Sequence, residues 1–137
     1  VLIQLDRQDE ALPLINKIRQ RAANSLENLK TADGSYILNY KCELYKPGVN
    51  CTWTKEFAWK AMEWENRLEL ACEGRRFFDL QRWGTLEKTM NAYFAVERNR
   101  FDWMNIARFT AGRDEFFPIS QAQMKWAKGN YTQNPGY

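Results

Sequence analysis

The sequence predicts a mainly α fold, made of helical hairpins joined by long irregular loops. Apolar residues recur every three or four positions, which is the period of an amphipathic helix, in three stretches: residues 8–23, 54–83 and 86–98. A turn-rich loop spans residues 25–53, and regular patterning fades over residues 100–137. We therefore expect residues 1–137 to form a single partial domain with one long loop and an irregular C-terminal region.

The composition indicates a globular domain that does not bind nucleic acid. A chain of 137 residues with 45% hydrophobic and 15% aromatic content can bury a core, which argues against disorder. The 20 basic and 17 acidic residues are spread along the chain, so no basic block predicts a nucleic-acid or anionic-membrane surface. No apolar run approaches the roughly 18 residues of a membrane-spanning helix.

The first predicted helix, residues 8–23, leads into the long loop. Pro13 lies either in the first turn of this helix or at a kink.

Within the loop, Cys42 and Cys51 flank a Pro-Gly turn. Their spacing suits a disulfide in an oxidising compartment, and two free thiols are the alternative. We expect Cys72, further along the chain, simply to pack against its neighbours.

The stretch from residue 54 to residue 83 is predicted to be a single long helix. Thr54 suits the N-cap position, where its hydroxyl can accept a backbone hydrogen bond. Gly84 follows the last periodic residue and ends the helix. Gly74 lies inside the pattern, and we expect its lack of a side chain to allow the close approach of a neighbouring backbone.

Charged residues crowd this predicted helix, and we interpret them as a structural ion network. Arg82 lies three positions after Asp79, a spacing that brings opposite charges together on one helix face. Glu69 and Glu73 have a spacing that also suits acid–base chemistry or metal binding, but an arginine lies within helical reach of the carboxylates. The network that we predict consists of Glu65, Glu69, Glu73, Arg75, Arg76, Asp79 and Arg82.

Two shorter elements are predicted after the long helix. Thr85 is expected to cap the helix over residues 86–98. Ser120 and Gln123 have the spacing of a capping box, which predicts a short helix that stops at Gly129.

The sequence contains no recognisable catalytic or metal-binding constellation. Histidine is absent, which excludes imidazole bases and His-ligated metals. No Gly-rich phosphate loop, nucleophile elbow or zinc-protease motif is present. We therefore expect neither an enzyme nor a bound cofactor or metal.

Three segments of the chain resemble the SusD/RagB family, in the order in which they occur there. Residues 65–84, ENRLELACEGRRFFDLQRWG, resemble its signature helix. Residues 11–22, ALPLINKIRQRA, resemble the helix that precedes it and end in the same Arg-x-Arg-Ala pattern. Residues 117–121, FPISQ, and residues 133–137, QNPGY, resemble the C-terminal close of the family. One departure is Asn66, where the family usually has arginine.

This resemblance implies the C-terminal portion of a nutrient-binding lipoprotein at the cell surface. Such proteins have TPR-like helical hairpins, are lipid-anchored to the outer membrane, and bind glycans or in some cases peptides. They act as a lid on a SusC-like TonB-dependent outer-membrane transporter. The resemblance places the lipid anchor in a preceding part of the protein.

The aromatic residues of the long loop are the candidates for ligand contact under this hypothesis. Sugar rings stack on aromatic faces while polar side chains bind their hydroxyl groups. The candidates are Tyr36, Tyr40, Tyr45 and Trp53, each of which could instead pack within the protein. The alternative function is a helical-repeat module whose groove binds a protein segment.

Overall fold

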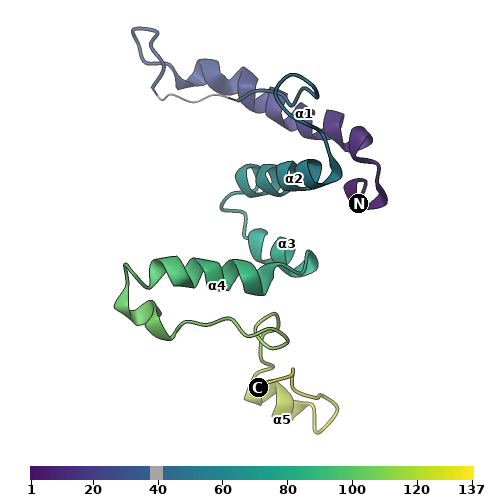
Figure 1. The fold of residues 1–137 in the computed structure, drawn as a ribbon. Coiled ribbons are helices and arrows are strands. Elements are labelled where there is room, and N and C mark those ends of the chain that lie inside the picture. Colours follow the sequence, from purple (N-terminus) through teal and green to yellow (C-terminus); the bar gives the residue numbers. More distant parts are fainter. Residues whose placement is uncertain (38–41) are drawn as a thin grey trace. The chain divides into compact units, whose positions relative to one another are not determined.

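The computed structural model describes residues 1–37 and 42–137, and Figure 1 shows their fold. The fold is mainly helical, as predicted, and the described residues contain isolated β-bridges but no strand. The chain divides into two compact units, Val1–Glu73 and Gly74–Tyr137, which are described separately below. None of the described helices is both long and apolar enough to cross a membrane.

The first unit is a pair of helices that pack side by side (Figure 1). Its helical elements are η1 (Ile3–Leu5), α1 (Gln8–Asn24), η2 (Ser25–Leu29) and α2 (Lys55–Glu69). The predicted helix over residues 8–23 is confirmed, and Pro13 lies inside α1 after its first turn. The buried core between η1, α1 and α2 is formed by Ile3, Ala11, Ile15 and Ala58.

The prediction of one long helix over residues 54–83 is wrong, because α2 ends at Glu69 and α3 begins at Arg76. The backbone between them is left-handed at two positions, with φ of 66° at Cys72 and 72° at Gly74. A Cβ added to Gly74 would meet nothing within 4 Å, so the expected close backbone approach is also wrong. Gly74 is suited to this position because it adopts a positive φ without steric cost.

The start of α2 agrees with the sequence. Thr54 Oγ1 accepts a hydrogen bond from the backbone N–H of Phe57 at 3.2 Å, which confirms the predicted N-cap. This bond satisfies one of the backbone donors that the first helical turn leaves without a partner.

The second unit holds three helices and one 3-10 turn. They are α3 (Arg76–Arg82), α4 (Leu86–Glu97), η3 (Asp102–Ile106) and α5 (Gln121–Trp126). Its core brings together Leu80, Leu86 and Phe109. Ser120 Oγ accepts from Gln123 N at 3.3 Å, which confirms the predicted cap. Thr85 makes no side-chain cap on α4, contrary to expectation, because its backbone, with φ of −111° and ψ of 4°, lacks the extended geometry of a capping residue.

Side-chain amides fasten the irregular segments to the helices. Asn16 of α1 donates to the carbonyl oxygen of Tyr45 at 2.9 Å and accepts from the same residue's N–H at 2.8 Å. Asn91 of α4 pairs with Phe109 in the same way, at 3.0 and 2.9 Å. We call this arrangement an amide clamp, since one side chain supplies both hydrogen bonds that a neighbouring strand would supply.

A third amide clamp joins the two C-terminal segments. Gln133 donates to the carbonyl of Ile119 at 2.8 Å and accepts from its N–H at 2.8 Å. The next residue, Asn134, donates to the carbonyl of Phe117 at 2.6 Å. Residues 133–137 therefore hold residues 117–121 in place through the backbone of the latter, so the two segments act as one structural piece.

Replacement of Leu86 by alanine tests the core of the second unit. Leu86 is 2% exposed, so Leu86→Ala should lower the free energy of unfolding by about 2–5 kcal/mol through lost burial and a residual cavity. Leu68 is 63% exposed, and Leu68→Ala is the matched control, expected to cost about 0.5 kcal/mol or less. Denaturant unfolding of the intact protein measures both, and equal losses would contradict this core assignment.

Candidate functional site

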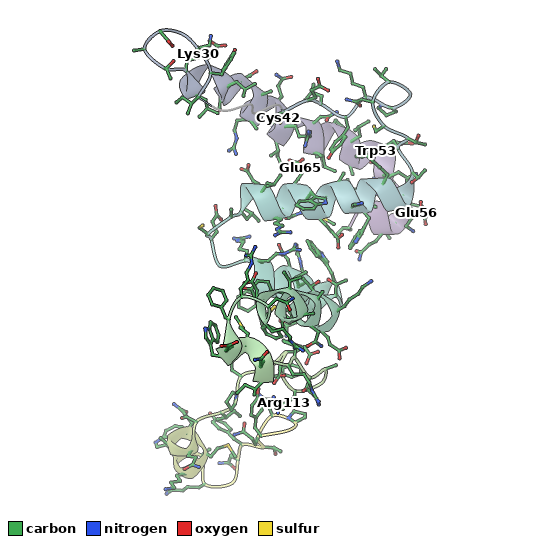
Figure 2. All side chains as sticks on the ribbon, turned by 60° about the vertical axis from the view of Figure 1, so that its left-hand side comes forward. Lys30, Cys42, Trp53, Glu56, Glu65 and Arg113 are labelled. Atoms are coloured by element: carbon green, nitrogen blue, oxygen red, sulfur yellow. The ribbon has the colours of Figure 1, made fainter. Side chains whose placement is uncertain are left out.

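Two arginines of α1 pair with two glutamates of α2. Arg19 pairs with Glu65, and Arg21 pairs with Glu69. The side chains of the first pair are only 17% and 10% exposed, whereas those of the second pair are 69% and 28% exposed. Figure 2 shows Glu65 at the face of α2 that is turned toward α1. The Arg19–Glu65 pair is thus the buried ionic contact of this interface.

The guanidinium of Arg19 is satisfied on several sides. It also donates to the carbonyl oxygen of Glu43, and its central carbon lies 4.4 Å from the centre of the Tyr45 ring. Burial by itself would lower the pKa of Arg19, but the hydrogen bond and the charge of Glu65 outweigh burial and raise that pKa above its ordinary value. Arg19 therefore stays charged and joins α1, α2 and the long loop.

The predicted ion network is divided between the two units. Asp79 is buried and pairs with Arg82 at 2.8 Å, at the spacing that the sequence indicated. The partners of Glu65 and Glu69 come from α1, which spacing within one helix could not reveal. The other predicted members differ in exposure: Glu73 and Arg75 are exposed, and Arg76 is half-buried with its guanidinium carbon 5.8 Å from the centre of the Trp83 ring.

Two of the predicted ligand aromatics, Tyr45 and Trp53, lie together beside the core of the first unit. Their ring centres are 5.6 Å apart, and Phe57 completes a three-ring cluster at 5.6 Å from Tyr45 and 5.9 Å from Trp53. Trp53 Nε1 donates to the carbonyl of Gln8 at 3.0 Å. Both residues are half-buried, so each offers at most part of its ring to a ligand.

Tyr36 is placed apart from that cluster. It is 55% exposed and pairs with Lys30 across an isolated antiparallel bridge just after η2. Its hydroxyl donates to Glu27 at 3.2 Å, and Lys30 Nζ lies 5.1 Å from the ring centre. Figure 2 shows Lys30 and Trp53 at opposite ends of α1. The candidates therefore do not form one site, and Tyr40 lies outside the described residues.

A hydrogen-bonded turn precedes Tyr36. The Asp33 carboxylate accepts from the Ser35 hydroxyl at 2.7 Å, from the Ser35 backbone N–H at 3.0 Å, and from the Thr31 hydroxyl. These bonds, that of the Ser35 hydroxyl foremost, lower the pKa of Asp33 to about 2. The turn therefore depends on an ionised Asp33.

The cysteines of the described residues are free thiols. Cys42 and Cys51 are half-buried and form no disulfide in this structure, and Cys42 Sγ donates to the carbonyl of Arg19 at 3.5 Å. Cys72 is exposed, so the expectation that it packs is wrong. The reason is that α2 ends before it, which places Cys72 in a turn where no second helix covers it.

Cavities occur in both units, and sequence reasoning did not find them. One of about 320 Å³ lies between η1 and the start of α2, lined by Ile3, Gln4, Lys55, Glu56 and Trp59. Another, of about 500 Å³, lies beside α4 in the second unit. The lining of the first comes from positions some fifty residues apart, so no local pattern marks it. No group of His, Cys, Asp or Glu within residues 1–37 and 42–137 is arranged to hold a metal ion.

Arg19→Ala tests the buried ion pair. Without the guanidinium, Glu65 keeps a buried charge that has lost its partner, so the free energy of unfolding should fall by about 3 kcal/mol or more. Arg7 pairs with Glu10 at the surface, with side chains 52% and 56% exposed, so the control Arg7→Ala should cost about 0.5 kcal/mol or less. Chemical denaturation measures both values, and a loss for Arg19→Ala as small as that of the control would contradict the assignment.

The turn before Tyr36 should depend on pH. Because the pKa of Asp33 is lowered in the folded state from 3.8 to about 2, the turn is stabilised at pH values above 3.8, and this contribution disappears as the pH falls toward 2. NMR titration of the Asp33 carboxyl carbon should give a midpoint near 2, and Ser35→Ala should raise it. Ser25→Ala is the control and should leave it unchanged. A midpoint of 3.8 for Asp33 in the wild-type protein would contradict the hydrogen bonds that Asp33 accepts in this turn.

Comparison with known proteins identifies the family. The model of the SusD family matches residues 2–137, nearly the whole chain. A search of curated proteins finds no match. Members of the SusD family are, in general, nutrient- or glycan-binding proteins of the outer membrane, and the family is one of binding proteins and not of enzymes. With a match of this extent, the chain belongs to the SusD family.

Proposed function

We propose that this protein captures oligosaccharides at the cell surface and delivers them to a TonB-dependent transporter of the SusC type. The observation that carries the proposal is the family match over residues 2–137. In this proposal the protein is lipid-anchored in the outer membrane, and the transporter performs the translocation. The protein itself binds the ligand and does not transform it.

The state of the acidic residues supports a binding role over a catalytic one. Glu65, Glu69 and Asp79 each form an ion pair with an arginine. A general acid or base must contact the group on its substrate that gains or loses the proton, whereas these carboxylates contact arginine side chains. These charges therefore stabilise the helices, and ligand recognition is left to other side chains.

Among the loop aromatics, Tyr36 is the one that we propose to contact the ligand. More than half of its surface is open to solvent, and the Asp33 turn and the Lys30 bridge hold it at the surface. Tyr45 and Trp53 contribute less, because much of each ring is already covered by the core. Tyr40 remains a candidate by sequence.

Isothermal titration of the intact protein with a panel of oligosaccharides tests the function. Wild-type protein should bind at least one glycan, and Tyr36→Ala should weaken that binding about tenfold, the loss of one aromatic contact. Tyr131→Ala, which removes a tyrosine of 46% exposure in the other unit, is the control and should bind normally.

Two outcomes would each contradict one part of the proposal. If no glycan binds but a peptide does, the protein is an interaction module. If glycans bind and Tyr36→Ala matches wild type, the function stands but the role of Tyr36 is wrong. Co-purification with a barrel transporter from outer-membrane extracts tests the partner separately.

A further inference from the structure

The turn after α4 presents two aromatic rings to solvent. Trp103 is 68% exposed and Phe101 is 46% exposed. Their ring centres lie 5.7 Å apart, and the ring planes are inclined at 35° to each other. Tryptophan rings usually bury most of their surface in folded proteins, so an exposed pair of this kind marks a contact surface.

The backbone holds these rings in a defined turn. Met104 N donates to the carbonyl of Phe101 at 2.9 Å, and Ala107 N donates to that of Met104 at 3.0 Å. Arg98, the residue that follows α4, donates from Nη2 to the carbonyl of Ala107 at 3.2 Å. The rings are therefore carried by a hydrogen-bonded turn that is tied to a helix, and binding a ligand there orders few additional groups.

Two polar side chains accompany the rings in this turn: Asp102 lies between them in the sequence, and Asn105 follows Trp103 by two positions. Asp102 and Asn105 are exposed, and neither side chain makes a hydrogen bond to any described residue. A carboxylate accepts hydrogen bonds and an amide both donates and accepts. A sugar presents two kinds of surface: apolar C–H faces and hydroxyl groups. The aromatic rings can cover the C–H faces, and the neighbouring polar side chains can bind the hydroxyl groups.

We propose that Phe101, Asp102, Trp103 and Asn105 form a binding platform for an uncharged oligosaccharide. The proposal rests on the proposed glycan-binding function and adds a site in the second unit. The exposed carboxylate of Asp102, next to both rings in the sequence, disfavours an acidic glycan at this point.

Binding measurements on the intact protein test the platform. The measurement is made in protein that carries Tyr36→Ala, so that the contact proposed in the first unit does not contribute. With an uncharged glycan that wild type binds, Trp103→Ala and Phe101→Ala should each raise the Kd of this protein at least tenfold. Trp103→Phe, which keeps an aromatic face, should recover most of the affinity. The matched control is Trp126→Ala: Trp126 is 77% exposed on α5, and its replacement should leave the Kd unchanged. Asp102→Asn should improve the binding of an acidic glycan relative to the uncharged one.

The outcomes separate this proposal from the function on which it rests. If wild type binds no glycan, both fail. If wild type binds but Trp103→Ala and Phe101→Ala leave the Kd of the Tyr36→Ala protein unchanged, only the platform is wrong. If these variants lose the transporter and keep the glycan, the turn is a protein contact and the platform is overturned. Far-ultraviolet circular dichroism and the unfolding midpoint should match wild type for each variant, because the replaced rings are exposed.

Discussion

The need to satisfy the backbone hydrogen bonds of long irregular segments shapes this chain more than any other constraint. The described residues contain no strand, so these segments cannot pair with a sheet. Asn16, Asn91 and Gln133 solve the problem in the same way, since each forms both hydrogen bonds with one distant residue. A buried backbone group without a partner costs about 1–3 kcal/mol, and each clamp supplies partners to two such groups.

The segments by which the chain resembles its family are the ones that contact one another. The Arg-x-Arg pattern of α1 supplies Arg19 and Arg21 to two glutamates of α2. Near the end of the chain, residues 133–137 clamp residues 117–121. The shared sequence features of this family are therefore features of its scaffold in this chain. That is consistent with ligand contacts that come from turns outside those motifs.

Local sequence patterns correctly predicted those helices that are not interrupted. The period of α1 and α4 and the cap at Thr54 follow from residues that are neighbours in sequence. The break between α2 and α3 was not predicted, because the apolar period continues through it, and only the left-handed residues Cys72 and Gly74 interrupt the helix. The sequence shows a glycine at position 74, but because the apolar period continues on both sides of it, that glycine did not indicate a helix break.

The functional residues were harder to predict, because their exposure depends on tertiary packing. Tyr36, Tyr45 and Trp53 look equivalent in the loop sequence, yet two of them pack on the core and one stays open. The pairing of Arg19 with Glu65 joins positions 46 residues apart, which no spacing rule relates. The exposed rings of the turn after α4 went unnoticed because regular patterning fades there. The available signal was the pair of aromatic residues Phe101 and Trp103 on either side of Asp102.

The amide clamps also affect how this protein ages. Deamidation of asparagine proceeds by attack of the following backbone nitrogen on the side-chain amide, and it leaves a carboxylate that can no longer donate to a carbonyl. Asn16 and Asn91 lie within α1 and α4, where the helical backbone resists the geometry of that attack. The third clamp, outside any helix, uses glutamine, whose longer side chain makes the corresponding ring closure slower. The three amide clamps thus use positions and residue types that resist spontaneous hydrolysis.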